Sequence, residues 1–224
     1  SKTNKNSVSL TLNYVSKDME EGFPGNLHTT VSYSLTSDNS LEIVYEAKTD
    51  KKTIVNLTNH AYFNLSGSFS NDILDHQVQI NANKMLPIDE FLIPTGDMAL
   101  VENTPFDFRT FKSIGKDIYI DNKQLKFGSG YDHCWALENQ NQGVRLVAKA
   151  YHKDSGRLLE VFSDKPGIQF YSGNHLSGKY QLRTGFCLET QHYPDSPNQK
   201  NFPSVELKPN EIYTSNTSYK FSIQ

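Results

Sequence analysis

Alternation of apolar and polar residues at every second position is the feature that most constrains how this chain can fold. An extended strand points successive side chains to opposite faces, so a period of two gives a strand one apolar face to pack on a core. The pattern recurs in SLTLNY (9–14), TVSYSL (30–35), LEIVYEA (41–47), QVQINA (77–82), VRLVAKA (144–150) and SYKFSI (218–223). The predicted core faces include Leu10, Leu12 and Tyr14 in the first segment, Leu41, Ile43 and Tyr45 in the third, Val78, Ile80 and Ala82 in the fourth, and Val144, Leu146 and Ala148 in the fifth.

Turn-forming segments rich in Gly, Pro, Asn and Asp separate these strands. Only FRTFKSIGKDI (108–118) has helical spacing, with Phe111, Ile114 and Ile118 on one side, and it predicts a short helix. The sequence contains no repeat or linker that would divide it. We therefore predict an all-β fold in which residues 1–224 form a single domain, a large and mostly antiparallel β-sandwich.

The composition argues against several classes of function. Tyr (12) and Phe (13) far outnumber the single Trp, which favours strands. The net charge of −3 and the scattered lysines argue against a nucleic-acid partner, which usually meets a basic stripe. No segment has the apolar length that crosses a bilayer, and the polar start SKTNKNS does not resemble a signal peptide. With only two cysteines, Cys134 and Cys187, a cytoplasmic protein with free thiols is expected.

Four segments concentrate side chains that could carry chemistry. They are NLTNHAYFNLSG (56–67) with His60, GSGYDHCWAL (128–137) with Asp132, GIQFYSGNHL (167–176) with Gln169 and His175, and FCLETQHYPDSPN (186–198) with Glu189. Glu189 stands inside an apolar and aromatic run, where burial would raise the pKa of its carboxyl group toward that of a general base. The alternative is that the strand alternation turns Glu189 to solvent, as is usual for glutamate.

His60 also has an ordinary alternative, a partly buried imidazole bonded to a backbone carbonyl. Asp132 follows Gly128 and Gly130 closely, and it could instead stabilise a turn. Other histidines are predicted to be structural or exposed, namely His28, His76, His133 and His152.

Three other chemistries fit the spacing poorly. The seven histidines form no H-x-H or H-x-x-x-H set, so no metal site is expected. GSGYD lacks the G-x-S-x-G pattern of a serine nucleophile, and Cys187 has no base beside it in the sequence. A Gly-rich phosphate loop needs a strand followed by a helix, and almost no helix is predicted. Acid–base chemistry by His60 and Glu189 remains, on a hydroxyl-rich ligand such as a sugar, with Asp132 and Gln169 as polar contacts.

Seven motifs resemble, in the same order, those of the aldose 1-epimerases, or galactose mutarotases. They are GFPGNL (22–27), NLTNHAYFNLSG (56–67), LPIDEFLIPTG (86–96), TPFDFR (104–109), GYDHCWAL (130–137), GIQFYSGN (167–174) and ETQHYPDSPN (189–198). The resemblance runs from about Gly22 to the C-terminus. It implies a large, mostly antiparallel β-sandwich that interconverts the α and β anomers of galactose, glucose and related aldoses without a cofactor.

The resemblance also implies roles for individual residues. Glu189 resembles the general base that removes the proton of the anomeric hydroxyl, and His60 resembles the general acid that protonates the ring oxygen. Asp132 resembles a carboxylate that accepts bonds from sugar hydroxyls, and Gln169 resembles a further polar contact. Acid and base are then expected to face each other on either side of one sugar-sized hollow.

The family's N-terminal third supplies outer strands, an arginine and a second histidine, and we expect it to be missing because nothing before GFPGNL resembles it. This chain would then be a fragment, or another chain would supply that part, and alone it would have much reduced activity. Two other functions stay open, a non-catalytic carbohydrate-binding β-sandwich and a relative that acts on hexose 6-phosphates. The latter would need a basic pocket, and only Arg183 lies near Glu189 in the sequence.

Overall fold

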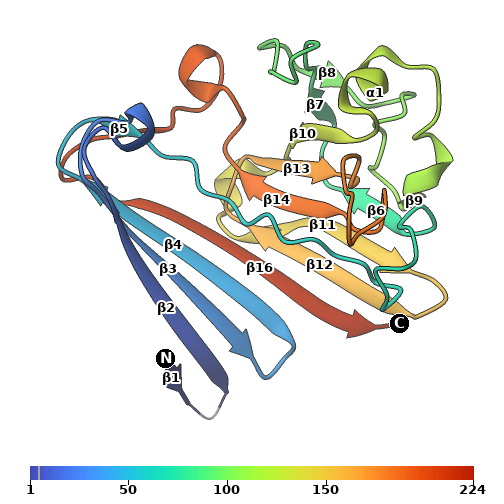
Figure 1. Cartoon of the computed structure of the whole chain (residues 1–224), viewed down its shortest axis with the longest axis horizontal. Helices are drawn as coiled ribbons and strands as arrows, with labels where there is room; N and C mark the ends of the chain where they lie inside the picture. The colour runs from blue at the N-terminus through green and yellow to red at the C-terminus, as the bar shows by residue number, and fades with distance from the viewer. Residues whose placement is uncertain (5) are drawn as a thin grey trace.

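The computed structural model describes residues 1–4 and 6–224, which form mainly two antiparallel sheets (Figure 1). Within these residues the larger sheet has nine strands. In their order across the sheet they are β1 (Lys2–Thr3), β2 (Ser7–Ser16), β3 (Leu27–Thr36), β4 (Ser40–Thr49), β16 (Tyr213–Ile223), β12 (Arg157–Ser163), β11 (Arg145–His152), β6 (Gln77–Ile80) and β9 (Lys112–Ser113).

The smaller sheet has five strands in the described part of the chain, and it packs on the larger sheet. Its strands, in order, are β14 (Cys187–Gln191), β13 (Gly167–Tyr171), β10 (Asp132–Ala136), β7 (Lys84–Leu86) and β8 (Ala99–Leu100). A separate pair joins β15 (Glu206–Leu207) to β5 (Thr53–Ile54). The prediction of an all-β, mostly antiparallel sandwich is confirmed.

The core lies between the two sheets, and strand alternation supplies it. Trp135, Phe170 and Leu188 of the smaller sheet are fully buried, and they belong to one apolar cluster with Ile43 and Val161 of the larger sheet. Burying a side chain of this size contributes about 1.5–3 kcal/mol. The residues between these core positions point to the opposite face of the smaller sheet, where the candidate site lies.

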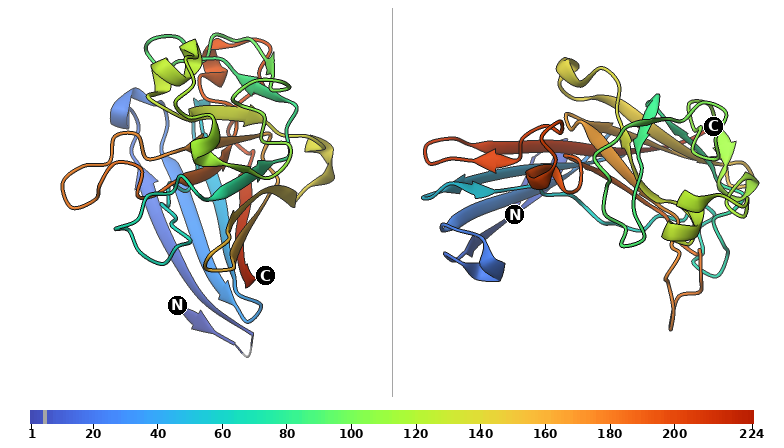
Figure 2. Two further views of the ribbon diagram at one scale, coloured as in Figure 1. Left: turned by 90° about the vertical axis from the view of Figure 1, so that its right-hand side faces the viewer. Right: turned by 90° about the horizontal axis from the view of Figure 1, so that it is seen from above.

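The N-terminal end of the larger sheet extends beyond the smaller sheet (Figures 1 and 2). On β2, Leu10, Leu12 and Tyr14 are 47%, 51% and 60% exposed, so their predicted place in the core is wrong. On β4, by contrast, Ile43 and Tyr45 are buried as predicted. The alternation identifies both strands, but whether a second layer covers an apolar face depends on the length of the opposing sheet.

At the start of β11 the predicted core face is displaced, although Ala148 is buried as predicted. Val144 is exposed and Leu146 half-buried, whereas Val147 and Ala148 are both buried. The pairing with β12 shifts between Leu146 and Ala148, which marks a β-bulge. A bulge inserts one extra residue into a strand, so the alternation changes phase there.

The helix predicted in 108–118 is wrong, because β9 and a single 3₁₀ turn, Ile114–Lys116, occupy this region. The described α-helix is α1 (Lys123–Gly128), whose N-cap residue Asn122 accepts two backbone N–H bonds. Six residues are too few for a helical period to be recognised in the sequence. No helix among residues 1–4 and 6–224 has the length and apolar character that spanning a membrane requires.

Candidate active site

Three adjacent strands of the smaller sheet bring the predicted polar residues together. Glu189 of β14 lies opposite Gln169 of β13, and β13 pairs in turn with β10, where Asp132 lies opposite Tyr171. Paired residues point to the same side of a sheet, and so do residues two apart on one strand. Asp132, Gln169 and Glu189 therefore share one face, the face turned away from the core.

The same alternation explains why a glutamate stands in an apolar run. Leu188 faces the core and is fully buried, whereas Cys187 and Glu189 point to the opposite face. Glu189 is nevertheless only 6% exposed. The alternative in which Glu189 points to solvent is therefore wrong, because another segment of the chain covers this face.

His60 belongs to that covering segment, which is fastened along β14 on both sides of the histidine. Before it, the Thr58 hydroxyl donates to the carbonyl of Thr190 over 3.1 Å. After it, the backbones of Phe63 and Phe186 exchange two hydrogen bonds of 2.8 and 3.0 Å. These anchors hold the His60 backbone over β14 with the imidazole directed at the strand.

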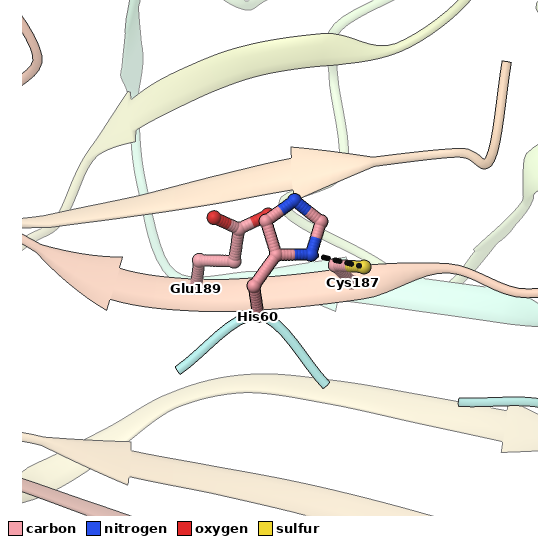
Figure 3. A group of neighbouring side chains, drawn as sticks. All are labelled: His60, Cys187 and Glu189. Atoms are coloured by element: carbon pink, nitrogen blue, oxygen red, sulfur yellow. Dashed lines mark hydrogen bonds and ion pairs between the residues drawn. The ribbon is translucent and has the colours of Figure 1, made fainter. Parts of the chain in front are cut away.

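The imidazole of His60 contacts two side chains of β14 at once (Figure 3). Its Nε2 lies 3.4 Å from Oε1 of Glu189, and its Nδ1 lies 3.3 Å from Sγ of Cys187. The His60 side chain is 53% exposed, so a ligand can reach it. The two predicted proton-handling groups thus converge, but they touch each other and do not stand apart across a hollow.

Glu189 has the electrostatic surroundings of a general base. Burial raises the pKa of its carboxyl group from 4.5 to about 8, and the nearby Asp132 carboxylate contributes in the same direction. A pKa close to neutral pH suits a group that must both accept and return a proton.

Asp132 and Gln169 form a hydrogen-bonded pair beside Glu189. Gln169 Nε2 donates to Asp132 Oδ1 over 2.8 Å. Burial raises the pKa of Asp132, while the hydrogen bond from Gln169 and the nearby His175 and His60 oppose the rise. Gln169 Oε1 is buried, and no donor in the described part of the chain reaches it. It is therefore a buried acceptor whose missing hydrogen bond calls for a partner from outside this part of the chain.

Cys187 is a site residue that the sequence did not predict. The thiol is fully buried, and burial raises its pKa, so the sulfur keeps its proton. Sγ lies 3.3 Å from His60 Nδ1, and this contact orients the imidazole so that Nε2 faces Glu189. Cys187 acts as a positioning residue and not as a nucleophile.

Two tyrosines, also not predicted, pack on the imidazole. The ring centroids of Tyr62 and Tyr171 lie 5.2 and 6.1 Å from that of His60. Burial is the main cause that raises the pKa of Tyr62 to about 12, so its hydroxyl is neutral near pH 7. Tyr171 accepts a hydrogen bond from the backbone N–H of His175 over 2.9 Å, which ties the loop after β13 to the site.

The fold also brings His76 and His152 next to Asp75. These three residues could hold a metal ion, and their spacing in the sequence did not predict such a group. His76 Nε2 accepts the backbone N–H of Leu65 over 2.9 Å, and His152 Nδ1 accepts that of Ser155 over 3.2 Å. Both histidines therefore direct an N–H group at the Asp75 carboxylate, at 2.9 and 3.2 Å. A metal would displace these protons, so the cluster fits a structural hydrogen-bond network better. The predicted structural roles of His76 and His152 agree with this geometry.

Both the sequence and the fold match known proteins. A family model described as aldose 1-epimerase matches residues 1–220. The chain belongs to the aldose 1-epimerase family. It is 45% identical over 217 residues to the galactose mutarotase of Bos taurus, and 40% identical over 227 residues to the aldose 1-epimerase of Escherichia coli K12. A solved galactose 1-epimerase from Lactobacillus acidophilus NCFM superposes with a TM-score of 0.88 at 30% identity, over 99% of this chain and 65% of that chain.

The family match corrects the sequence-based resemblance. It begins at residue 1, and not near Gly22 as the motifs predicted. The predicted absence of the family's N-terminal third is not borne out by this match. The alignments cover 93% of this chain and 61% of the bovine relative, and 97% of this chain and 65% of the bacterial one. The chain thus spans less than two thirds of the length of these relatives, so their activity is not assigned to it by the alignment alone.

Proposed function

We propose that this chain acts as an aldose 1-epimerase, which interconverts the α and β anomers of galactose, glucose and related aldoses. The observation that carries the proposal is the 3.4 Å contact between His60 Nε2 and Glu189 Oε1, on the face that Asp132 and Gln169 share. An acid and a base side by side, with acceptors for hydroxyl groups around them, suit a reaction that moves two protons. The names of the relatives, galactose mutarotase and aldose 1-epimerase, support the same chemistry.

Ring opening removes one proton and adds another. Glu189, as the carboxylate, takes the proton from the hydroxyl on C1, and the electrons of that O–H bond form the C1 carbonyl. The bond from C1 to the ring oxygen breaks, and protonated His60 gives a proton from Nε2 to that oxygen. Both oxygens are bonded to C1, so the acid and the base must reach neighbouring atoms. Direct contact between His60 and Glu189 suits this requirement better than an arrangement across the ring.

Reclosure uses the same two groups in exchanged roles. The open aldehyde rotates about the bond between C1 and C2 and presents its other face to the C5 hydroxyl. Neutral His60 removes the proton of that hydroxyl, and protonated Glu189 returns a proton to the carbonyl oxygen. Both residues end in their starting states, so the cycle balances without any redox partner. General acid and general base catalysis typically contribute about 10²–10⁴-fold each.

Polarimetry of freshly dissolved α-D-galactose tests the proposal. The chain is expected to speed the change in optical rotation, and Glu189→Gln and His60→Asn each to lower kcat about 100-fold or more. Both variants should still bind galactose in a calorimetric titration. If the wild-type chain binds galactose without speeding mutarotation, the non-catalytic sugar binder replaces the enzyme. The same measurement tests the expectation that the chain alone has much reduced activity.

The hexose 6-phosphate alternative gains no support from Arg183. Its guanidinium donates from Nη2 to the carbonyl of Ser129 over 3.0 Å and lies 5.1 Å from the ring centroid of Tyr119. Only 8% of the residue is exposed. A phosphate group needs an accessible cation, and this guanidinium is packed into the protein.

A further inference from the structure

His60, Cys187 and Glu189 form a cluster of three side chains that can bind a metal (Figure 3). One ring nitrogen of His60, the sulfur of Cys187 and one carboxylate oxygen of Glu189 all lie within 4.8 Å of one another. The sequence predicted no metal site, because its histidines do not pair at a ligand spacing. The fold instead combines one histidine with a cysteine and a glutamate of β14, and the cysteine lies 127 positions away along the chain.

The separations between these ligand atoms are close to those of a tetrahedral zinc site. Zinc bonds of about 2.3 Å to sulfur and about 2.0–2.2 Å to nitrogen or oxygen place neighbouring ligand atoms about 3.4–3.6 Å apart. Sγ of Cys187 lies 3.3 Å from Nδ1 of His60, and Oε1 of Glu189 lies 3.4 Å from Nε2. Whichever nitrogen binds, one of these two contacts already has the length that a shared ion needs. A small rotation of the half-exposed imidazole brings the third ligand into range.

The ring nitrogens of His60 are available to a metal, unlike those of His76 and His152. Within residues 1–4 and 6–224 they contact the two side chains of β14, and no backbone N–H group bonds to either nitrogen. In the cluster around Asp75, a backbone N–H group occupies one nitrogen of each histidine. Of these two clusters, only the one at His60 therefore offers a metal a ring nitrogen without disturbing a backbone hydrogen bond.

The charges of the cluster favour a divalent cation. A thiolate and a carboxylate carry one negative charge each, so Zn²⁺ makes the set of three ligands neutral overall. Cys187 is fully buried and Glu189 is only 6% exposed, and a neutral set costs less to bury than either anion alone. The thiol releases its proton to solvent when its sulfur binds the metal, and Glu189 binds as the carboxylate.

The donor atoms select the kind of metal. Thiolate and imidazole are ligands that suit zinc, whereas Mg²⁺ and Ca²⁺ take oxygen ligands. Three protein ligands leave a fourth tetrahedral position. A water molecule or a sugar hydroxyl can fill this position, because the His60 side chain is 53% exposed.

We propose that His60, Cys187 and Glu189 form a binding site for a zinc ion that blocks the proton transfers of the proposed epimerase. Bound zinc takes the carboxylate lone pair that Glu189 needs as a base, and its positive charge disfavours protonation of the imidazole. The blockade rests on the proposed function, whereas zinc binding itself does not.

Calorimetric titration with zinc chloride tests the site directly. The wild-type chain is expected to bind one zinc ion, and Cys187→Ser to bind it at least about tenfold more weakly, because a hydroxyl is a poorer zinc ligand than a thiolate. Cys134→Ala and His28→Ala are the matched controls, since Cys134 is the other buried cysteine and His28 is an exposed histidine, both outside the cluster. Cobalt in place of zinc gives a second readout, a thiolate-to-metal absorption band that Cys187→Ser should lack. Circular dichroism confirms that each variant keeps its fold.

Polarimetry of galactose measures the blockade. Zinc is expected to slow mutarotation by the wild-type chain, and excess EDTA to restore it. Cys187→Ser, compared with its own rate without zinc, should need at least about tenfold more zinc for the same fractional inhibition. Mg²⁺ at the same concentrations should slow neither protein. Zinc that speeds the reaction, or that inhibits both proteins equally, would overturn the proposal.

The outcomes separate the metal site from the proposed function. Galactose turnover without zinc binding overturns the metal site and leaves the epimerase intact. If galactose is not turned over at all, the proposed function fails, and calorimetry with the cobalt band still decides the metal site. Zinc binding that Cys187→Ser weakens then supports the site, whereas equal binding by the two proteins, or none, overturns it.

Discussion

Replacing Glu189 with Gln should stabilise the fold at high pH, because it removes a buried negative charge. The pKa of Glu189 is about 8 in the folded chain, against an ordinary value of 4.5. Between these two values the folded state retains a proton that the unfolded state has lost, so stability falls as pH rises through this window. The difference of about 3.5 pH units corresponds to a loss of about 5 kcal/mol in the free energy of unfolding. This loss is complete above pH 8 and absent below pH 4.5. Such an amount is a large part of the stability of an ordinary domain.

Urea unfolding at pH 5, 7 and 9 measures this effect. The free energy of unfolding of Glu189→Gln, relative to wild type, is expected to increase by up to about 5 kcal/mol between pH 5 and pH 9. The amide occupies nearly the same volume as the carboxyl group, so packing contributes little to the change. Glu42→Gln is the matched control, because Glu42 is exposed on β4 and has no burial cost to lose. Equal stability differences at pH 5 and pH 9 would show that Glu189 is not a buried carboxylate with a raised pKa.

Three further predictions concern the site and the limits of the core. The value of kcat/KM for galactose should rise with pH as Glu189 ionises and fall again at higher pH, because the reaction also needs a protonated His60; a flat polarimetric profile would contradict these two roles. Cys187→Ala should lower kcat about three- to tenfold, because His60 loses the contact that orients its ring, whereas Cys187→Ser should retain most activity since the serine hydroxyl can also form a hydrogen bond with Nδ1. In urea unfolding, Leu12→Ala should cost less than about 1 kcal/mol and Ile43→Ala about 2–5 kcal/mol; similar costs would mean that β2 is covered after all.

The strands could be predicted because alternation follows from the geometry of each strand alone. The segments around Ile43 and Val78 are strands, with the predicted faces buried. The same pattern failed for Leu12, because burial there depends on a second sheet that does not extend over β2. It also failed near Val147, where a bulge changes the phase of the alternation and no sequence signal marks it.

Only some of the residues of the candidate site could be predicted from the sequence. Motif resemblance identified His60, Gln169 and Glu189, which the fold does bring to one face. The residues it missed each stand two positions from a predicted one: Tyr62 after His60, Tyr171 after Gln169, and Cys187 before Glu189. On β13 and β14, two positions is the distance between side chains on one face, so this spacing was the available signal for Tyr171 and Cys187. Sequence distance hid the pairing of Cys187 with His60, because 127 positions separate them.

The strand β14 shows how the fold tolerates an unfavourable catalytic group. At high pH, ionised Glu189 lowers the free energy of unfolding by about 5 kcal/mol, and the Cys187 thiol, which keeps its proton, supplies no charge to offset this. The opposite face of the same segment carries Phe186 and Leu188, both fully buried, and each contributes about 1.5–3 kcal/mol of stability. Burial of Phe186 and Leu188 therefore stabilises the strand that carries Glu189, while the burial of Glu189 itself disfavours its ionised form. A glutamate in an apolar strand is thus consistent with a base whose burial raises its pKa and whose neighbours on the core face offset the cost.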